Sequence, residues 1–553
     1  MVFGMRASAS ASAIDIAATK QWYVTRRASR HFGLFRRTRI QRIEASRIPV
    51  VSPATGAFLA EVPDEGSAGA ASAVEAARAA SAAWAALPVS RRTEALKKWR
   101  DLILDNVSLV AETLASESGK PRHEAEVFEV VYLCELIRFA CRSARRALAE
   151  ETRNPLLFLT KKTRLLRKPL GVVGVIGPWN FPILNNAADC VAPLVMGNAV
   201  VLKPSEVTPL TSLLLRDLWI RAGNPRDVFR VVTGRGETGG ALVEHADGIM
   251  FTGSVATGRR VASRAGERLI PCVVELGGKS PFVVLAGADL ERAASAAAWS
   301  SFINSGQVCI RTERIYVEEP VAEKFETLLV ERVRALRPRG EGAQPCNPHD
   351  LGAVTTIRQI EVVERQIADA TAKGARIAVG GQRNPVRTGQ FFPPTVLLGA
   401  TQEMEVMREE TFGPLVGVAR VRDAEEALRL ANDSHLGLNA SVFGPPREAA
   451  AFARRLQSGQ AMVNDVLVNY FVVESPLGGW KASGLGLRHG VESLRQWTRI
   501  EAITETRPLL APVEKLIARR LAFPYGRGFL ELVRRVTRLL YRRGLANKLR
   551  RPS

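Results

Sequence analysis

The segment 171–182, GVVGVIGPWNFP, decides the fold class of this chain. It begins with a short run of apolar, mostly β-branched residues, which is typical of a buried strand, and it ends in a turn bounded by prolines. Four further runs of this kind follow: NAVVLK at 198–203, VFRVVTG at 228–234, GIMFTG at 248–253 and PCVVELGG at 271–278. Segments with helical spacing separate the five runs, at 185–197, 208–223, 237–246 and 254–269. This alternation predicts a parallel sheet with right-handed crossovers, in which ligands bind at the carboxyl ends of the strands.

The regions on both sides of this sheet complete an α/β chain. Residues 70–150 are rich in Ala, Arg and Leu with a helical period, and we expect them to pack as helices on the first sheet. A second series of apolar runs and helical stretches begins near residue 281 and continues to about residue 480. The pattern therefore predicts two α/β domains of similar size.

The net charge of +22 is concentrated at the two ends of the chain. Residues 1–45 carry nine Lys and Arg against two acids, and residues 507–553 carry thirteen against two, so the ends hold 18 of the 22 charges. The long middle of the chain has a balanced charge and no basic groove pattern. We therefore expect no nucleic-acid binding.

Chain length and cysteine usage limit the other classes of protein to which the chain can belong. The 553 residues, 46% of them apolar, can bury a large core, and no run of 18 apolar residues predicts a membrane-spanning helix. The six cysteines lack a C-x-x-C pair and the dense spacing of a disulfide framework, which indicates a reducing compartment and a cytoplasmic protein. The six histidines form no clustered ligand set, so no metal site is predicted.

Three residues are candidates for covalent catalysis. Cys309 follows the polar, glycine-containing NSGQ, and a thiol in such a loop has a backbone N–H beside it for an oxyanion. Glu275 ends an apolar strand beside a Gly-Gly turn, where burial raises a carboxyl pKa toward that of a general base. Asn180 lies in the Pro-bounded turn after a strand and offers an amide donor. Each residue alone is equally consistent with a core thiol, a strand end or a turn residue.

Read together, seven motifs identify a family. They are GPWNFP (177–182), VVLKPSE (200–206), FTGSVATG (251–258), VELGGKS (274–280), NSGQVC (304–309), EETFGP (409–414) and PLGGWKASGLG (476–486). With these motifs in this order, the chain resembles the aldehyde dehydrogenase superfamily from about residue 48 to residue 505. Glu275 and Cys309 stand 34 positions apart, as the base and nucleophile of the hydrolytic members do.

The resemblance implies an α/β, aldehyde dehydrogenase-like fold made of three parts. These are a Rossmann-like NAD(P)-binding domain (46–149 and 171–277), an α/β catalytic domain (278–484) and a small β oligomerisation element (150–170 and 485–506). A basic tail (1–45) and a basic amphipathic extension (507–553) flank them. A homodimer or homotetramer is the implied assembly.

The resemblance also implies the chemistry. Cys309 as thiolate attacks the aldehyde carbon, and the Asn180 side chain and the Cys309 backbone N–H hold the oxyanion. The thiohemiacetal gives a hydride to the nicotinamide. Glu275 then deprotonates the water that hydrolyses the thioester and releases a carboxylic acid.

The implied cofactor site follows the strand ends. Lys203 and Glu206 lie on the adenosine ribose, and because a carboxylate repels a 2′-phosphate, NAD is expected in preference to NADP. The remaining implied cofactor residues are Trp179, Gly236, Gly253, Ser254, Leu276, Glu410 and Phe412. Among them Gly253 and Ser254 open a helix beneath the pyrophosphate, and Glu410 with Phe412 holds the nicotinamide ribose.

Substrate choice is predicted from departures from the family. Succinate-semialdehyde enzymes carry arginines where this chain has Ala188 and Ile303, and the aromatic residue of many members is replaced by Leu477. We therefore expect an open apolar tunnel for aliphatic or aromatic aldehydes. Arg311, two residues after the cysteine, is the cation that would serve a semialdehyde, although a structural role is the favoured interpretation.

Several alternatives remain at this stage. A succinate-semialdehyde dehydrogenase and a catalytically silent scaffold are the two rivals, and a CoA-acylating or phosphorylated-substrate reductase is disfavoured by Glu275. In 529–543, apolar residues fall on one helical face and arginines largely elsewhere, which is typical either of a helix docked on protein, the favoured interpretation, or of one on an anionic membrane. The Arg-rich N-terminus is read as an organelle transit segment, which would place the protein in an organelle matrix, or as a tail.

Overall fold

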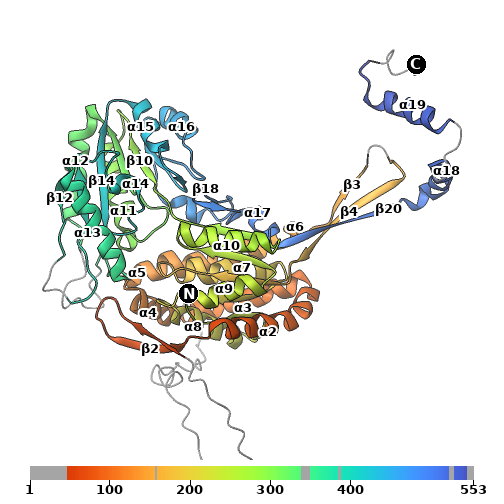
Figure 1. Cartoon of the computed structure of the whole chain (residues 1–553), viewed down its shortest axis with the longest axis horizontal. Helices are drawn as coiled ribbons and strands as arrows, with labels where there is room; N and C mark the ends of the chain where they lie inside the picture. Colours follow the sequence, from red (N-terminus) through yellow and green to blue (C-terminus); the bar gives the residue numbers. More distant parts are fainter. Residues whose placement is uncertain (1–45, 156–157, 338–348, 384–387, 522–527, 545–553) are drawn as a thin grey trace, which may run out of the picture. The chain divides into compact units, whose positions relative to one another are not determined.

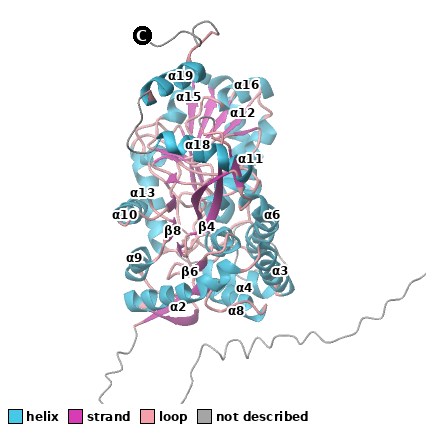
Figure 2. Cartoon of the chain, turned by 90° about the vertical axis from the view of Figure 1, so that its right-hand side faces the viewer, coloured by secondary structure: helices cyan, strands magenta, loops and turns pink. Residues whose placement is uncertain are grey.

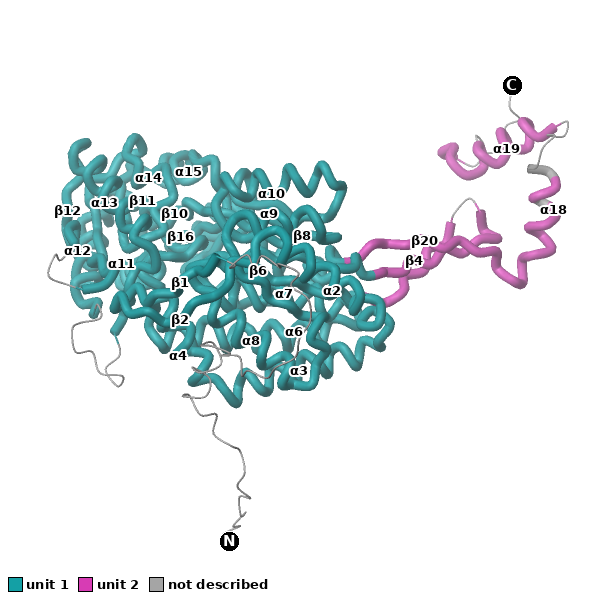
Figure 3. The backbone as a smooth tube through the Cα atoms, turned by 60° about the horizontal axis from the view of Figure 1, so that its bottom comes forward, with its two compact units in different colours: residues 1–147, 169–497 teal, residues 148–168, 498–553 magenta. Residues whose placement is uncertain are grey.

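The computed structural model describes residues 46–155, 158–337, 349–383, 388–521 and 528–544; its elements are labelled in Figure 1 and coloured by type in Figure 2. The predicted basic tail 1–45 lies outside the described residues. The chain divides into two compact units (Figure 3). Unit 1 comprises residues 1–147 and 169–497, and unit 2 comprises residues 148–168 and 498–553.

The first sheet of unit 1 contains the five strands predicted from the sequence. They are β5 (Val172–Ile176), β6 (Ala199–Lys203), β7 (Phe229–Val231), β8 (Gly248–Thr252) and β9 (Cys272–Glu275). All five are parallel in the order β9-β8-β5-β6-β7, and β19 (Gly484–Leu485) pairs antiparallel with β9. The chain adds β6 and β7 on one side of β5 and then β8 and β9 on the other. This reversal creates a switch point at the carboxyl ends of β5 and β8, where ligands bind in such sheets.

Helices connect these strands as predicted. They are α7 (Ala188–Val195), preceded by the π-helical turn η2 (Ile183–Ala187), and α8 (Leu210–Arg221), α9 (Gly236–His245) and α10 (Val255–Glu267). Every residue of β5, β6 and β8 is buried, since helices lie on both sides of the sheet (Figure 2). The apolar runs without alternation in the sequence reflect this two-sided burial.

The Ala-rich segment ahead of the sheet is helical and packs on it, as expected. Its helices are α2 (Gly66–Ala86), α3 (Val89–Asp105), α4 (Val107–Ser118), α5 (Arg122–Glu124) with η1 (Ala125–Val130), and α6 (Val131–Ala147). The small side chains of Ala70, Ala73 and Ala77 share a core cluster with Val172 and Val201 of the sheet. Small residues at these positions let the backbone of α2 approach the strands closely.

The second α/β series forms a seven-stranded sheet in the same unit. Its order is β12-β13-β14-β11-β10-β16-β17, from β10 (Pro281–Val284), β11 (Arg314–Glu318), β12 (Arg376–Val379), β13 (Thr395–Leu398), β14 (Leu415–Val421), β16 (Ser441–Phe443) and β17 (Met462–Val463). Only β12 runs antiparallel to its neighbour among the paired strands of this sheet in the described part of the chain. Its helices are α11 (Leu290–Phe302), α12 (Glu319–Arg334), α13 (Ile357–Ala372), α14 (Glu405–Arg408), α15 (Ala424–Asn432) and α16 (Pro446–Ala453).

The described residues of unit 2 form a three-stranded sheet and the α-helices that follow it. The sheet has the order β20-β4-β3, formed by β3 (Glu151–Arg153), β4 (Lys161–Pro169) and β20 (Thr498–Thr506). Lys161 and Glu514 form an ion pair of 2.9 Å between β4 and α18 (Ala511–Leu521), and α19 (Phe529–Tyr541) follows. Residues 485–497, which the sequence grouped with this element, belong to unit 1.

Candidate active site

A tight turn presents Cys309 between α11 and β11. Asn304, Ser305 and Gly306 have φ values of 50°, 54° and 75°, a left-handed conformation that is unusual for serine. Gly306 is required here, because a Cβ at this position would lie 2.1 Å from the carbonyl oxygen of Gly413. The NSG sequence ahead of the cysteine therefore encodes a strained loop, a feature that clusters at functional sites.

The thiol of Cys309 is half-buried, and charged groups act on it. Burial raises its pKa to about 12; the cation of Arg488 acts against this, and the carboxylates of Glu275 and Glu410 add to it. The backbone N–H of Cys309 also favours its own thiolate. The thiol is therefore protonated at neutral pH, and a nucleophilic role requires that a nearby base accept its proton.

Glu275 lies at the carboxyl end of β9, as its sequence position predicted. Its Cα pairs with Thr252 of β8 on one side and with Gly484 of β19 on the other. Burial raises the pKa of Glu275 to about 7, and its Oε1 has no hydrogen-bond partner among the described residues. A carboxylate with a free oxygen and a pKa near neutrality has the properties of a general base.

Hydrogen bonds connect Asn180 to the loop that carries Cys309. Its Nδ2 donates to the carbonyl oxygen of Gln307 at 2.9 Å, two residues before the cysteine. The backbone carbonyl oxygen of Asn180 accepts from Lys120 Nζ at 2.9 Å and from Asn304 Nδ2 at 3.0 Å. These bonds hold Asn180 against the loop that carries Cys309.

Sequence reasoning missed the ion pair that supports this asparagine. Lys120 and Glu129 are buried and bonded to each other, and Lys120 also lies 4.0 Å from the centre of the Phe181 ring. The other oxygen of Glu129 accepts from the backbone N–H of Ile183 at 2.8 Å. The two residues belong to no recognisable motif, so only the fold brings them together.

The predicted nucleotide residues line the carboxyl edge of the first sheet. Lys203 ends β6, where burial lowers its pKa, and its Nζ lies 3.3 Å from Oε2 of the half-exposed Glu206. Ser254 caps α10, and its Oγ accepts from the N–H of Thr257 at 3.3 Å. Gly236 is the first residue of α9.

The glycines of this edge are needed for close packing. A Cβ on Gly253 would lie 2.7 Å from the Phe251 ring, and a Cβ on Gly258 would lie 2.3 Å from the Leu276 side chain. Two helix N-termini, a lysine and an exposed carboxylate thus surround the switch point of the sheet. This donor set fits a dinucleotide, since helix N-termini bind phosphate and carboxylates bind ribose hydroxyls.

Glu410 and Phe412 approach this edge from the second sheet. Glu410 Oε1 accepts from the N–H of Gly278 at 3.0 Å, and burial raises the pKa of Glu410 to about 7. A Cβ on Gly277 would lie 2.4 Å from the Glu410 carboxylate, which explains the Gly-Gly pair. The Phe412 ring packs edge-on against Trp179 at 5.5 Å.

An apolar pocket opens at Cys309. Its walls are Phe128, Phe181, Leu184, Asn185, Trp299, Ile303, Val308, Ile310, Leu467, Tyr470 and Phe471. The ring centres of Phe471 and Phe128 lie 6.0 Å apart. The segment directly before α6 and the segment before β18 (Trp480–Lys481) therefore close the pocket together. No charged side chain lines it in the part of the chain that the structure describes.

A buried arginine behind this pocket was also missed. Arg488 binds Asp189 through both carboxylate oxygens, at 2.9 and 2.7 Å, and donates to Asn185 Oδ1 at 3.0 Å and to the Tyr470 hydroxyl at 3.1 Å. The sequence signal was a lone arginine after the glycine motif, eight residues beyond Trp480. Asp189 and Asn185 lie 299 and 303 positions away in the chain and could not be inferred from spacing.

Arg311 has the structural role favoured from the sequence. Its Nε donates to Glu313 at 2.7 Å, and its other nitrogens donate to the carbonyl oxygens of Ser301, Thr312 and Leu415. The side chain is fully buried, and it does not line the Cys309 pocket.

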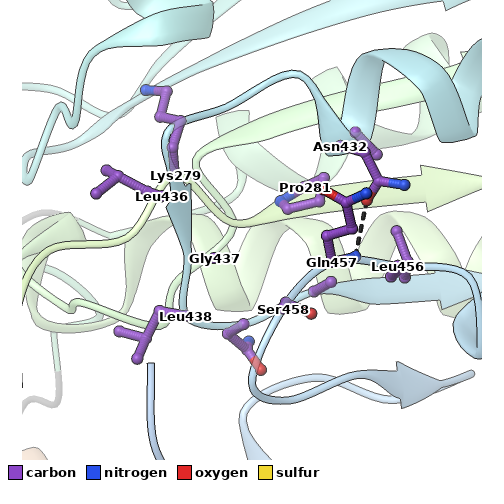
Figure 4. Close-up of a pocket in the computed structure, with 12 residues that line it drawn as sticks. Lys279, Pro281, Asn432, Leu436, Gly437, Leu438, Leu456, Gln457 and Ser458 are labelled. Atoms are coloured by element: carbon purple, nitrogen blue, oxygen red, sulfur yellow. Dashed lines mark hydrogen bonds between the residues drawn. The ribbon is translucent and has the colours of Figure 1, made fainter. Parts of the chain in front are cut away.

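A second, smaller pocket lies away from the thiol, between β10 and the loops near α15 (Figure 4). Lys279 lines it, but its Nζ is bonded to Glu313 at 2.7 Å. The Gln457 N–H donates to Asn432 Oδ1 at 2.8 Å along its wall. These groups already satisfy one another, so this pocket offers no reactive group.

Comparisons with known proteins match most of this chain to one family. The model of the aldehyde dehydrogenase family matches residues 40–503. A Mycolicibacterium smegmatis protein is named "Putative succinate-semialdehyde dehydrogenase", and its name gives NADP(+) as the cofactor. It is 41% identical to this chain over 464 residues, which cover 83% of this chain and 89% of that protein. The 4,4'-diapolycopene aldehyde oxidase of a Methylomonas species is 38% identical over 453 residues, or 81% and 83%.

Solved structures give the same result. Lactaldehyde dehydrogenase from Escherichia coli has a TM-score of 0.80 at 33% identity, covering 84% of this chain and 97% of that one. A Mycobacterium tuberculosis aldehyde dehydrogenase complexed with NAD+ has a TM-score of 0.79 at 31% identity, covering 84% and 95%. The chain belongs to the aldehyde dehydrogenase family and is an oxidoreductase that acts on aldehydes with NAD or NADP.

Proposed function

We propose that this enzyme oxidises apolar aliphatic or aromatic aldehydes to carboxylic acids. The pocket at Cys309 carries the proposal, because aromatic and aliphatic side chains form nearly all of its wall. Its two polar groups, the Asn185 amide and the Tyr470 hydroxyl, are already bonded to Arg488. An apolar substrate tail therefore gains burial, at about 25 cal/mol per Å², without depriving a polar group of its partner.

The site residues have these proposed roles. Cys309, after losing its proton, forms a bond from sulfur to the aldehyde carbon, and Asn180 with the Cys309 N–H stabilises the oxyanion. Bound oxidised nicotinamide supplies the hydride acceptor. Glu275, whose Oε1 is free among the described groups, then takes a proton from the water that cleaves the thioester.

We propose NAD as the preferred cofactor, although the Mycolicibacterium smegmatis relative is named for NADP. Support comes from Glu206, whose carboxylate beside Lys203 suits a ribose with two free hydroxyls and opposes a 2′-phosphate. The ratio of kcat/KM for NAD to that for NADP should exceed one and should fall in Glu206→Gln. A wild-type ratio below one would reject this preference.

A succinate-semialdehyde dehydrogenase is the second candidate, favoured by the name of that same relative. The pocket opposes it, since position 303 contributes an isoleucine and Arg311 is committed to Glu313 and backbone carbonyls. A carboxylate in this pocket would lack a cationic partner among the described lining residues, at a substantial desolvation cost.

The deciding experiment is nicotinamide reduction with hexanal, a long-chain aldehyde, benzaldehyde and succinate semialdehyde, with each cofactor. We expect kcat/KM to be highest for an apolar aldehyde and turnover to be absent in Cys309→Ala. Cys134, a free cysteine of α6 that does not line the pocket, provides the matched control Cys134→Ala. A clear preference for succinate semialdehyde would overturn the substrate proposal, and silence with every aldehyde would favour a scaffold.

We also propose that the β20-β4-β3 sheet is the oligomerisation element of a homodimer or homotetramer. β20 is an edge strand, and its Ile500 and Ile503 are 59% and 44% exposed. An exposed apolar edge strand is a ready site for pairing with another chain. Light scattering after size exclusion should give a multiple of 60.2 kDa, reduced to one chain by Ile500→Lys with Ile503→Lys.

A cytoplasmic location with contact to an anionic membrane through 529–543 is proposed as well. The five cysteines among the described residues are free, which suits a reducing compartment. In α19 one face bears Leu532, Val533, Val536, Leu539 and Leu540, each 38–54% exposed, while arginines occupy much of the rest. No helix of the described residues is long and apolar enough to span a membrane.

A lipid surface explains this helix better than a second copy does. Nearly all of the net positive charge lies in the two ends of the chain, which suits an anionic lipid surface, whereas the rest of a second copy has a balanced charge. In flotation with phosphatidylserine vesicles, Leu532→Gln with Leu539→Gln should reduce binding, and Leu530→Gln, off the apolar face, should not. Equal flotation of all three proteins would reject the proposal.

A further inference from the structure

Arg488 lies between the strand end that carries Glu275 and the pocket that contains Cys309. The residue is buried and follows β19, whose Gly484 is paired with Glu275. Its Nη2 is bonded to the Thr252 hydroxyl, and Thr252 is the register partner of Glu275 on the other side. The guanidinium is therefore fixed beside the strand end that carries Glu275.

The same guanidinium reaches the substrate pocket. Its Nη1 donates to Asn185 Oδ1 at 3.0 Å and to the Tyr470 hydroxyl at 3.1 Å, and these two residues line the pocket together with Cys309. Asp189 holds the other edge of the guanidinium through two bonds. With its donors fixed by four partners, the group has little freedom to move.

The charged groups around the Cys309 thiol include the Arg488 cation, which favours the thiolate. The charged groups with the largest effect on the Cys309 thiol are Arg488, Glu275 and Glu410, and of these three only Arg488 is a cation. Asp189 also acts on Glu275, while burial lowers the pKa of the adjacent His489 to about 3, which leaves it neutral. Burial disfavours the cation itself, but Asp189, Tyr470 and Glu275 hold the pKa of Arg488 well above its ordinary value.

We propose that Arg488 is a positioning residue that stabilises the Cys309 thiolate through space and fixes Asn185 and Tyr470 at the pocket wall. Asp189 sets the strength of this effect, since its negative charge offsets part of the guanidinium charge. The inference rests on the proposed role of Cys309 as nucleophile.

The test follows the rate of iodoacetamide alkylation of each cysteine against pH by peptide mass spectrometry, in the full chain without cofactor. In Arg488→Met we expect Cys309 to react at least about tenfold more slowly at neutral pH, since a pKa higher by one unit reduces the thiolate tenfold. In Asp189→Asn we expect the opposite change, a faster reaction, and in Arg488→Lys a rate between those of wild type and Arg488→Met.

The cysteines of α6 report on folding in the same samples. Cys134 and Cys141 are partly buried there, and their reactivity rises if a variant unfolds. If Arg488→Met raises the reactivity of Cys134 or Cys141, that variant is unfolded and cannot be used. The direction of the change in the Cys309 alkylation rate in Asp189→Asn then decides the test. Unchanged Cys309 rates, or changes of the same sign in both variants with native Cys134 reactivity, would overturn the inference.

Failure of the proposed function would give a different experimental result from failure of the positioning role. If alkylation of wild-type Cys309 leaves aldehyde oxidation intact, the nucleophile itself is wrong. If alkylation abolishes oxidation while the Arg488 variants keep the wild-type pH profile, only the positioning role fails.

Discussion

Glu275 is buried and Glu410 is half-buried, and burial raises the pKa of both carboxylic acids to about 7, yet their surroundings differ. Glu410 accepts a backbone hydrogen bond from Gly278, whereas Glu275 Oε1 has no partner among the described residues. An unsatisfied buried oxygen is costly and is expected where a ligand or water completes it. Glu275 is therefore the carboxylate suited to activating water.

This difference predicts a pH dependence. Only the deprotonated form accepts a proton, so we expect kcat, where thioester hydrolysis limits it, to rise with pH through a pKa of about 7. Glu275→Gln should lower kcat by about 10²- to 10⁴-fold while a burst of one reduced nicotinamide per active site remains. Stopped-flow absorbance measures both quantities, and a missing burst would place Glu275 in the first step instead.

Asn180 provides the second residue-scale prediction. Asn180→Ala removes an oxyanion donor, and we expect kcat/KM to fall by about 10²- to 10³-fold. Because Asn180 Nδ2 also bonds Gln307, the melting temperature must be measured beside the kinetics. A fall in kcat/KM that disappears at temperatures well below melting would indicate a structural role only.

At the scale of elements, the turn after β9 fixes the distance between the two sheets. A Cβ on Gly278 would lie 2.4 Å from the carbonyl oxygen of Cys309, so the backbone must shift to accept any side chain. We expect Gly278→Ala to lower both the melting temperature and the alkylation rate of Cys309. The matched control is Gly240→Ala, inside α9, where a Cβ meets nothing within 4 Å and stability should rise by about 0.5–1 kcal/mol. Equal effects of the two substitutions would contradict the packing argument.

The elements of unit 1 were largely predictable. The five apolar runs became the five parallel strands, since two-sided burial leaves a pattern that the sequence displays directly. The turns were not: Phe412, Leu467 and His489 have φ between 51° and 59°, and none is a residue type whose sequence context announces this conformation.

At the scale of the whole molecule, the proposed contact of α19 with lipid depends on charge. Binding that depends on arginines of α19 is screened by salt, because the Debye length falls from about 10 Å at 0.1 M to about 3 Å at 1 M. We expect vesicle flotation to weaken steadily as NaCl rises and to require anionic lipid. Binding that persists in 1 M NaCl would assign the contact to the apolar face alone.

The sequence by itself determined the fold class, the order of the strands along the chain and the positions of Cys309, Glu275 and Asn180, because motifs and local burial patterns are properties of contiguous residues. The tertiary structure decided what surrounds them: Lys120 with Glu129 behind Asn180, and Arg488 with Asp189 behind the pocket. These pairs depend on contacts between segments as far as 299 positions apart. A buried charge needs a partner in space, and spacing along a chain does not name that partner.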